Sequence, residues 1–374
     1  MSKSQFQKKS SVLLSSIILA SATSAFAGGT IKVGDDKSIS VGMGLRTAFT
    51  SSEDTNNFSL QNARIYLSGQ VNKDFKFTYN TEEIWGSYGV LDAIIQYEPS
   101  KAFNIWMGRH LTPADRIEMN GPFYGLSWNQ YTMPLYSSDE DPKTRAGAYG
   151  RDNGITAWGT INKFQYAIGV FDGLQGGANI DDNLLFAGRF AYNFLSMEDN
   201  PAYYTSSTYY GGLGDIFTVA VSGQQQSDGA GIEGNSVDFM GAAIDFLYET
   251  KLGSGDVITV EGEYKVMDAD LNATALASED NFFMFDGASY FATAAYLLAN
   301  PIGKGKFQPY VRFTSVEPTD ENIGSSDLTE VGVNYVVASH SMRLNFNVTS
   351  GDASPSGAPG IDATSYTFGM QQQF

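Results

Sequence analysis

The amino-acid sequence predicts an all-β protein, a transmembrane antiparallel β-barrel of about sixteen strands. Three observations lead to this fold class. Apolar residues alternate with small or polar residues in many short runs spread over the chain. The N-terminus has the features of an export signal. The C-terminus is an alternating run whose last residue, Phe374, is aromatic. A soluble sandwich strand would show the same alternation, so the three observations are needed together.

The first 27 residues resemble a cleaved signal peptide. A lysine-rich start precedes the apolar run 12–20, and Ala25-Phe26-Ala27 has the small-x-small form of a cleavage site. That run is too short for a membrane anchor, which needs roughly 20 residues as a helix. We therefore expect a signal peptide at 1–27, cleavage near Ala27, and one barrel domain at 28–374 in the outer membrane of a Gram-negative bacterium.

Composition is consistent with a barrel and excludes several functions. Hydrophobic residues make up 42% of the chain, as expected where half of every strand faces water, and aromatic residues make up 13%, which suits interfacial girdles. The chain has no cysteine, which excludes thiol catalysis and cysteine-ligated zinc. Loss of three leader lysines takes the formal net charge from −18 to −21. This acidity argues against a nucleic-acid partner.

The alternating runs give the predicted strands. In the last run Tyr366 and Phe368 fall on one face, and Thr367 and Gly369 fall on the other. An even number of such runs is what a closed antiparallel membrane barrel requires. The predicted strands are 39–46, 62–71, 75–80, 91–97, 103–108, 154–161, 164–171, 184–194, 215–225, 237–248, 257–267, 289–299, 306–315, 328–337, 342–349 and 364–374.

The connections between these runs alternate in length. Short ones predict periplasmic turns, and long, mostly acidic ones predict external loops. Two connections are unusual. The segment 196–214 occupies a periplasmic position but is long, and its pairs Tyr203-Tyr204 and Tyr209-Tyr210 suggest either a cluster at the bilayer rim or a subunit contact. The connection 110–151, after the fifth strand, is the longest.

Several stretches resemble, in the same order, the phosphate-selective porin O and P family. They are Asn62-Ala63-Arg64-Ile65-Tyr66-Leu67-Ser68-Gly69, Val90-Leu91-Asp92-Ala93, Ile105 to Pro113, Phe307 to Phe313, Val331 to Tyr335 leading to His340, and the closing strand. The resemblance implies a sixteen-stranded, trimeric pore whose loop after strand five folds inward. We also expect a lipid bilayer and lipopolysaccharide as surroundings, small ions and solutes as cargo, and no cofactor. The family includes pores of varied preference, so phosphate selectivity stays open.

Alternation places a set of basic residues on lumen-facing positions. These predicted pore-lining residues are Arg46, Arg64, Lys76, Arg189, Arg312 and Arg343, with Lys265 alongside. Fixed arginines along a path would favour anions. Alternatively, carboxylates on or near the same face neutralise them in pairs; these are Glu82, Asp92, Asp245, Glu261, Glu263 and Glu330. Arg109 shares parity with Met107, so it faces lipid unless the strand ends or bulges, and we place it at the loop base.

The long loop combines charge with aromatic residues. Its predicted constriction residues are Asp115, Arg116, Glu118, Asp139, Glu140 and Asp141, with an aromatic run from Phe123 to Tyr136 between them. A loop of this length is usually functional or disordered, and its aromatics favour packing against the barrel wall. We expect the part between Thr112 and Tyr136 inside the barrel, facing at least two of Arg46, Arg64 and Arg312. The alternative is a loop over the mouth, its acids bridged by divalent cations to lipopolysaccharide.

The sequence contains one candidate catalytic pair and one candidate metal site. His110 and His340 are the only histidines and fall at opposite ends of the barrel, so only a pair of His110 with Asp115 or Asp139 stays open. We predict no enzyme, with a surface-enzyme barrel as the alternative. One segment has the oxygen-ligand spacing of a calcium loop, through Asp268, Asp270, Asn272 and Glu279. Ala273 replaces the usual glycine there, which favours an ordinary acidic loop and no metal.

The predicted function is an outer-membrane porin for passive diffusion of small hydrophilic solutes and ions. The alternative is an anion- or phosphate-selective pore that uses the lumen arginines. Acidic external loops enrich cations at the mouth but are screened within about 8–10 Å at physiological salt. If the inward loop leaves Arg64 and Arg312 unpaired, we expect weak anion selectivity.

Overall fold

The computed structural model describes residues 28–34, 36–53, 55–84, 87–136, 150–174, 179–232, 234–269 and 285–374. Over these residues the chain forms seventeen strands and one helix. In chain order they are β1 (Gly29–Lys32), β2 (Ser38–Ser51), β3 (Asn56–Gln70), β4 (Phe75–Ile84), β5 (Ser87–Tyr97), β6 (Asn104–Leu111), α1 (Arg116–Tyr124), β7 (Arg151–Ile161), β8 (Phe164–Phe171), β9 (Leu185–Asn193), β10 (Ile216–Ile232), β11 (Asn235–Lys251), β12 (Val257–Asp268), β13 (Gly287–Leu297), β14 (Lys306–Pro318), β15 (Ser326–Ala338), β16 (Met342–Gly351) and β17 (Ala363–Gln373).

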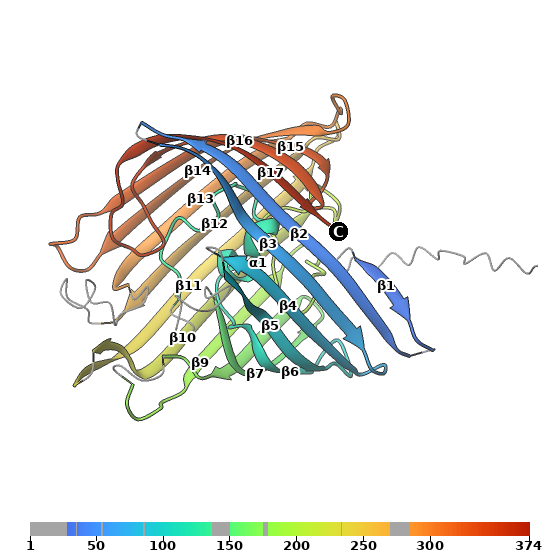
Figure 1. The fold of residues 1–374 in the computed structure, drawn as a ribbon, viewed down its shortest axis with the longest axis vertical. Helices are drawn as coiled ribbons and strands as arrows, with labels where there is room; N and C mark the ends of the chain where they lie inside the picture. The colour runs from blue at the N-terminus through green and yellow to red at the C-terminus, as the bar shows by residue number, and fades with distance from the viewer. Residues whose placement is uncertain are drawn as a thin grey trace, which may run out of the picture.

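Strands β2 to β17 form a closed antiparallel barrel of sixteen strands, which confirms the predicted architecture (Figure 1). Each strand pairs with the next along the chain, and β17 closes the ring by pairing with β2, Phe368 opposite Phe49. The backbone of Phe374 exchanges two hydrogen bonds of 3.0 Å with Met43. The preceding part of β2, from Ser38 to Val41, pairs with β1 instead of β17. Because the ring is closed, it has no edge strand that would expose unpaired backbone groups.

Alternating burial along each strand distinguishes the two faces of the wall. In β2 the side chains of Met43 and Leu45 are 40% exposed on the outside, while Arg46 is only 4% exposed. In β14 Val311 and Phe313 point outward and Arg312 is buried between them. An apolar exterior with charged residues inside is the pattern of a barrel whose outer face contacts lipid.

The single helix described, α1, lies in the long connection after β6, inside the ring of strands (Figure 1). Asp115 caps it by accepting a hydrogen bond of 3.1 Å from the Glu118 amide. Gly121 has φ +62°, a conformation that favours glycine, and the helix kinks there before Pro122. In the described part of the chain, no helix has the length and apolarity needed to cross a membrane.

Two local features differ from simple alternation. Gly108 in β6 has φ +126°, which turns the following residue, so Arg109 is buried while Met107 is 62% exposed. Arg109 donates to the Val90 carbonyl at 3.2 Å, at the base of the loop. The segment 196–214 also differs: Tyr203 is 6% exposed and packs on Trp106, with ring centroids 5.8 Å apart. The expectation of a rim cluster or subunit contact for this pair was wrong, because the segment folds into the barrel.

Candidate pore constriction

Residues 112–136, here called the constriction loop, contact inward-facing side chains of strands all around the ring. Backbone carbonyls of the loop accept hydrogen bonds from Arg46 at 2.8 Å, Arg343 at 2.6 Å, Asn334 at 2.9 Å and Lys265 at 3.0 Å. These donors belong to β2, β16, β15 and β12. A segment that touches inward positions on so many strands occupies the interior, and most of its residues are buried.

Charged side chains fix the start of the constriction loop. The Lys265 ammonium lies 2.5 Å from Asp115, 2.8 Å from Glu118 and 3.7 Å from Glu263. Burial raises the pKa of Glu118, although Lys265 opposes this shift. The buried Lys265 ammonium therefore holds the start of the constriction loop against β12.

Arg116 joins this loop to two other parts of the molecule. Its guanidinium lies 2.7 Å from Glu198, in the segment 196–214, and 3.3 Å from Asp245 in β11. Arg189 shares the same Asp245 at 2.5 Å. Burial opposes ionisation of Glu198, but Arg116 outweighs it and lowers the pKa of that carboxyl.

Three of the predicted pore-lining residues form ion pairs. Arg64 in β3 lies 2.6 Å from Glu82, and Arg189 in β9 pairs with Asp245. Lys76 pairs with Glu98 at 2.5 Å near the periplasmic turn. The condition for anion selectivity that an inward loop leaves Arg64 unpaired is not met, because Glu82 lies directly opposite it on β4.

The other three, Arg46, Arg312 and Arg343, have no carboxylate within ion-pair distance among the described residues. Arg46 lies over the Trp128 ring at 4.2 Å, and Arg312 lies over Phe291 at 4.0 Å. Each of the three keeps at least one buried guanidinium nitrogen without a hydrogen-bond partner among those residues. Arg312 faces Glu330 on β15, but that carboxylate instead accepts the Trp128 amide at 3.0 Å.

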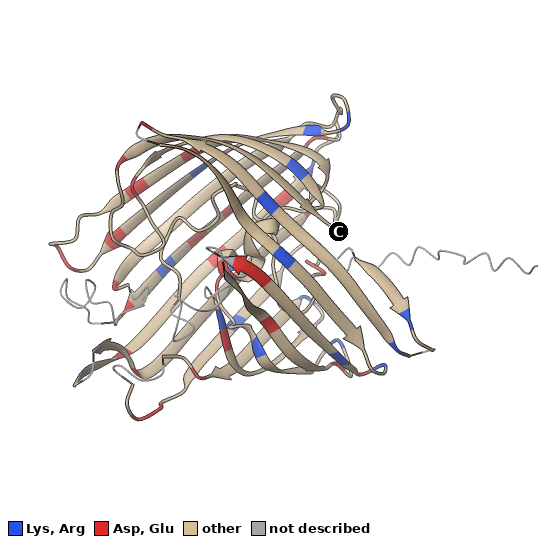
Figure 2. Cartoon of the chain, viewed as in Figure 1, with Lys and Arg blue, Asp and Glu red and all other residues tan. Residues whose placement is uncertain are grey.

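Carboxylates concentrate on another part of the wall. Asp245 and Glu249 lie on β11, and Glu261 and Glu263 lie on β12, all buried. Figure 2 shows how charged residues are distributed along the strands, with Lys and Arg in blue and Asp and Glu in red. Arg343 on β16 and Arg46 on β2 lie apart from the acids on β11 and β12, which places opposite charges on separate parts of the interior. Such an arrangement creates a transverse field that orients water and disfavours apolar solutes.

The segment 196–214, here called the periplasmic segment, meets the constriction loop inside the barrel. The Thr205 amide donates to the Met119 carbonyl at 3.2 Å, and the Ser207 amide donates to the Tyr124 carbonyl at 3.1 Å. The Asn120 amide group donates to the Ser207 hydroxyl at 2.7 Å. Sequence reasoning missed this contact. Its one signal was a long connection where a tight turn was expected.

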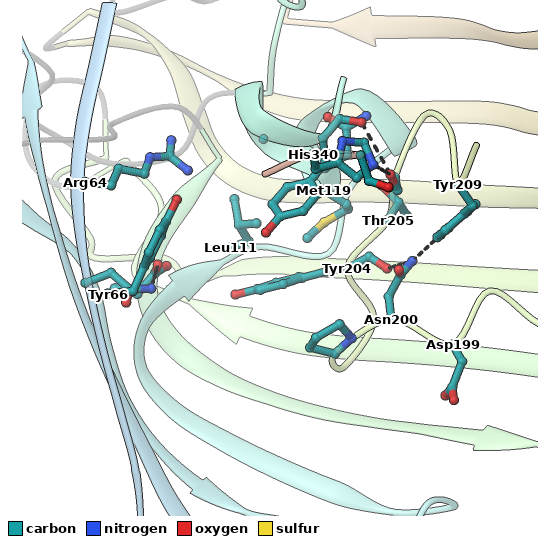
Figure 3. Close-up of a pocket in the computed structure, with 18 of the residues that line it drawn as sticks. Arg64, Tyr66, Leu111, Met119, Asp199, Asn200, Tyr204, Thr205, Tyr209 and His340 are labelled. Carbon is teal, nitrogen blue, oxygen red and sulfur yellow. Dashed lines mark hydrogen bonds between the residues drawn. The ribbon is translucent and has the colours of Figure 1, made fainter. Parts of the chain in front are cut away.

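A cavity of about 330 Å³ lies between the wall, α1 and the periplasmic segment (Figure 3). Arg64 and Asp92 line its wall side, and Met119 belongs to α1. Tyr204 and Asn200 come from the periplasmic segment. Arg64 is paired with Glu82, and Asp92 is paired with Arg151 at 3.0 Å.

The remaining predicted site residues fall into two groups. His110 is buried, and its ring nitrogens contact the Gly108 carbonyl at 2.9 Å and the Thr156 hydroxyl at 2.8 Å, so neither is bonded to Asp115. Asp268 ends β12, and the described residues contain no cluster of three potential metal ligands. Outside the described residues lie the leader 1–27, Asp139, Glu140, Asp141, Asp270, Asn272 and Glu279.

A closed sixteen-stranded barrel with a constricted, charged interior defines an outer-membrane porin. The profile of the phosphate-selective porin O and P family matches residues 39–374, so the chain belongs to this family. This confirms the family that the sequence motifs indicated. A comparison with curated protein sequences gave no significant match.

Solved porin structures share the fold at low sequence identity. OmpF of Salmonella typhi, in complex with daunomycin, has a TM-score of 0.60 at 12% identity, covering 92% of this chain and 100% of that chain. The trimer form of OmpT of Vibrio cholerae has a TM-score of 0.57 at 13% identity, covering 91% and 100%. A mutant of the Rh. blastica porin has a TM-score of 0.54 at 14% identity, covering 90% and 100%.

Proposed function

We propose that this porin is a passive diffusion channel for small hydrophilic solutes and ions, without catalytic activity. The observation that carries this proposal is the separation of buried arginines and carboxylates across the interior. Charged groups facing a narrow path favour hydrated, polar solutes over apolar ones. Within the described part of the chain, the His110 ring contacts Gly108 and Thr156 and no carboxylate, which supports a protein without a catalytic pair.

The mature chain, in this proposal, spans residues 28–374 after cleavage near Ala27. It works as a homotrimer in the outer membrane, in contact with lipid and lipopolysaccharide. The trimer form of the similar Vibrio cholerae structure supports this assembly. The external acidic loop that contains Asp268 carries no metal in this proposal.

A second candidate function is a weak preference for anions. Arg46, Arg312 and Arg343 support it, because no carboxylate pairs with them among the described residues. Their buried guanidinium N–H groups are arranged around the loop tip at Ser127 and Trp128. Unpaired guanidinium groups in a site of low dielectric attract oxyanions more strongly than screened surface charges do.

The test is the reversal potential of the purified trimer in a planar bilayer under a KCl gradient. We expect channels, and a potential on the anion side that persists at high salt. Arg46→Ala and Arg312→Ala should each shift the potential toward cations. Lys76→Ala, which removes a partly exposed and paired charge, is the matched control and should shift it less. A cation-selective wild type at high salt overturns the anion preference, and absence of channels overturns the porin proposal.

A further inference from the structure

The cavity between the wall, α1 and the periplasmic segment is lined by five tyrosines, and we call it the tyrosine cavity. These are Tyr66, Tyr124, Tyr204, Tyr209 and Tyr210. We propose that the tyrosine cavity is a binding site on the permeation path for a neutral, polyhydroxylated solute of sugar size. This inference rests on the proposed diffusion function and names a substrate class for it.

The charges around the cavity are already neutralised. Arg64 makes two hydrogen bonds to Glu82, at 2.6 and 3.0 Å, and Arg151 pairs with Asp92. A charged solute would lose its hydration without gaining a free counter-charge, which is costly in a buried site. A neutral solute has no such cost. Asp199 also lines the cavity but is exposed to solvent.

His340, at the same cavity, is also neutral under ordinary conditions. Burial, together with the neighbouring Arg343, lowers the pKa of His340 to about 4. Its ring contacts the Ser206 hydroxyl at 3.2 Å and the Thr208 carbonyl at 2.9 Å. At neutral pH it therefore adds hydrogen-bonding capacity to the cavity without adding charge.

Neutral polar groups among aromatic rings suit a sugar. Tyrosine presents an apolar ring face for C–H groups and a polar hydroxyl for hydrogen bonds. The hydroxyl of Tyr204 and Oδ1 of Asn80, both on lining residues, have no hydrogen-bond partner among the described residues. The Tyr204 hydroxyl can donate a hydrogen bond and Oδ1 of Asn80 can accept one, and a solute hydroxyl can do both. Figure 3 shows Tyr204 reaching from the periplasmic segment toward Leu111 and Tyr66.

Size and position agree with this class of solute. A volume of about 330 Å³ is at the lower end of ligand pockets. The lining includes Leu213 and Ser339, which belong to periplasmic connections, and Arg64, which lies deep in β3. The cavity therefore reaches from the periplasmic end toward the constriction, where a diffusing solute would pause.

The experiment measures binding and conduction separately on the folded full-length chain. Glucose and maltose are titrated from the periplasmic side of a planar bilayer while single-channel current is recorded. In parallel they are titrated into detergent-solubilised protein while tryptophan fluorescence is recorded. Trp106 lies 5.7 Å from the Tyr204 ring and would report occupancy. We expect saturable current reduction and a saturable fluorescence change with the same half-saturation concentration.

Tyr204→Phe removes only the hydroxyl and should raise that concentration between about twofold and tenfold, as expected for one hydrogen bond. Tyr264 is 49% exposed on the outer face of β12, so Tyr264→Phe is the matched control and should leave the half-saturation concentration unchanged. If the charged sugars gluconate or glucosamine bind as tightly as glucose, the proposal that the site selects neutral solutes is overturned. Absence of saturable fluorescence change overturns the site. Saturable binding without any channel supports the site while overturning the diffusion function.

Discussion

The constriction loop and the periplasmic segment enter the barrel from opposite ends and are held there differently. The constriction loop is fixed to the wall by buried charges, above all Lys265 with Asp115 and Glu118. The periplasmic segment is fixed by a buried ion pair, Glu198 with Arg116, by neutral hydrogen bonds to the constriction loop, and by Glu249, which accepts from the Thr208 hydroxyl at 2.7 Å. The wall therefore positions the loop, and the loop in turn positions the segment.

This difference implies an order of strength. Removing one partner of a buried ion pair costs about 3–5 kcal/mol, whereas one neutral hydrogen bond contributes about 0.5–1.5 kcal/mol. Charge changes on the constriction loop should therefore disturb both segments. Changes confined to the periplasmic segment should leave the loop in place.

The largest effect is expected for Arg116→Met, because Arg116 is the one charged residue of the constriction loop that bridges wall and periplasmic segment. The change leaves Glu198 buried without its cation, while Asp245 keeps Arg189. We expect a loss of about 3–5 kcal/mol in the free energy of unfolding. Heat-induced unfolding of the detergent-solubilised barrel measures it. Arg116→Lys, which keeps the charge, should lose less, and equal losses for both would contradict this role.

The next effect compares deletions in the two segments. Deleting 119–131 removes the tip that fills the interior, and should raise single-channel conductance clearly. Deleting 203–208 should raise it less, because the constriction loop stays bound to β12 through Lys265. Conductance in planar bilayers measures both. A larger increase for the second deletion would show that the periplasmic segment is the main barrier.

The strands were predictable from sequence because the period-two pattern is repeated in every run. Some pairing was predictable as well. Arg64 and Glu82 are equidistant from Lys73 in the tight turn between β3 and β4, so a hairpin places them opposite one another. Glu82 is among the carboxylates expected to neutralise lumen arginines in pairs, and this register explains why it pairs with Arg64. The alternation along a strand shows which charged residues face the lumen. Which of them form pairs depends on the register between neighbouring strands.

The fate of Arg312 could not be read from sequence. Register places it opposite Glu330, yet the constriction loop presents the amides of Trp128 and Asn129 to that carboxylate, at 3.0 and 3.3 Å. A distant segment thus changes the partner of a strand residue. The inward fold of the periplasmic segment was hidden for a similar reason. Ser206 and Ser207 resemble a solvated turn until the loop supplies their partners, Arg116, Asn120 and Tyr124.

A smaller effect tests the paired charges of the wall. Glu82→Gln removes the carboxylate that neutralises Arg64, so Arg64 should then act on passing ions. We expect the reversal potential under a KCl gradient to move toward anions. Glu98→Gln, which releases Lys76 near the periplasmic turn, is the matched control and should move it less. Equal shifts would show that position along the pore does not matter.

The smallest effect concerns pH and the periplasmic segment alone. Burial lowers the pKa of His340 to about 4, below its usual value of about 6.5. When the periplasmic segment is undocked, His340 therefore binds a proton that the docked state excludes, and docking loses stability as pH falls from about 6.5 toward 4. His340 is faced by the Tyr124 and Tyr210 rings, Ser206 and Arg343, and none of these offers a carboxylate to accept the new charge. Amides of 205–210 should exchange hydrogen faster at pH 5 than at pH 7.5, after correction for intrinsic rates. His340→Gln should remove this pH dependence, whereas a dependence that persists would assign it to the carboxylates around Lys265 and Arg116.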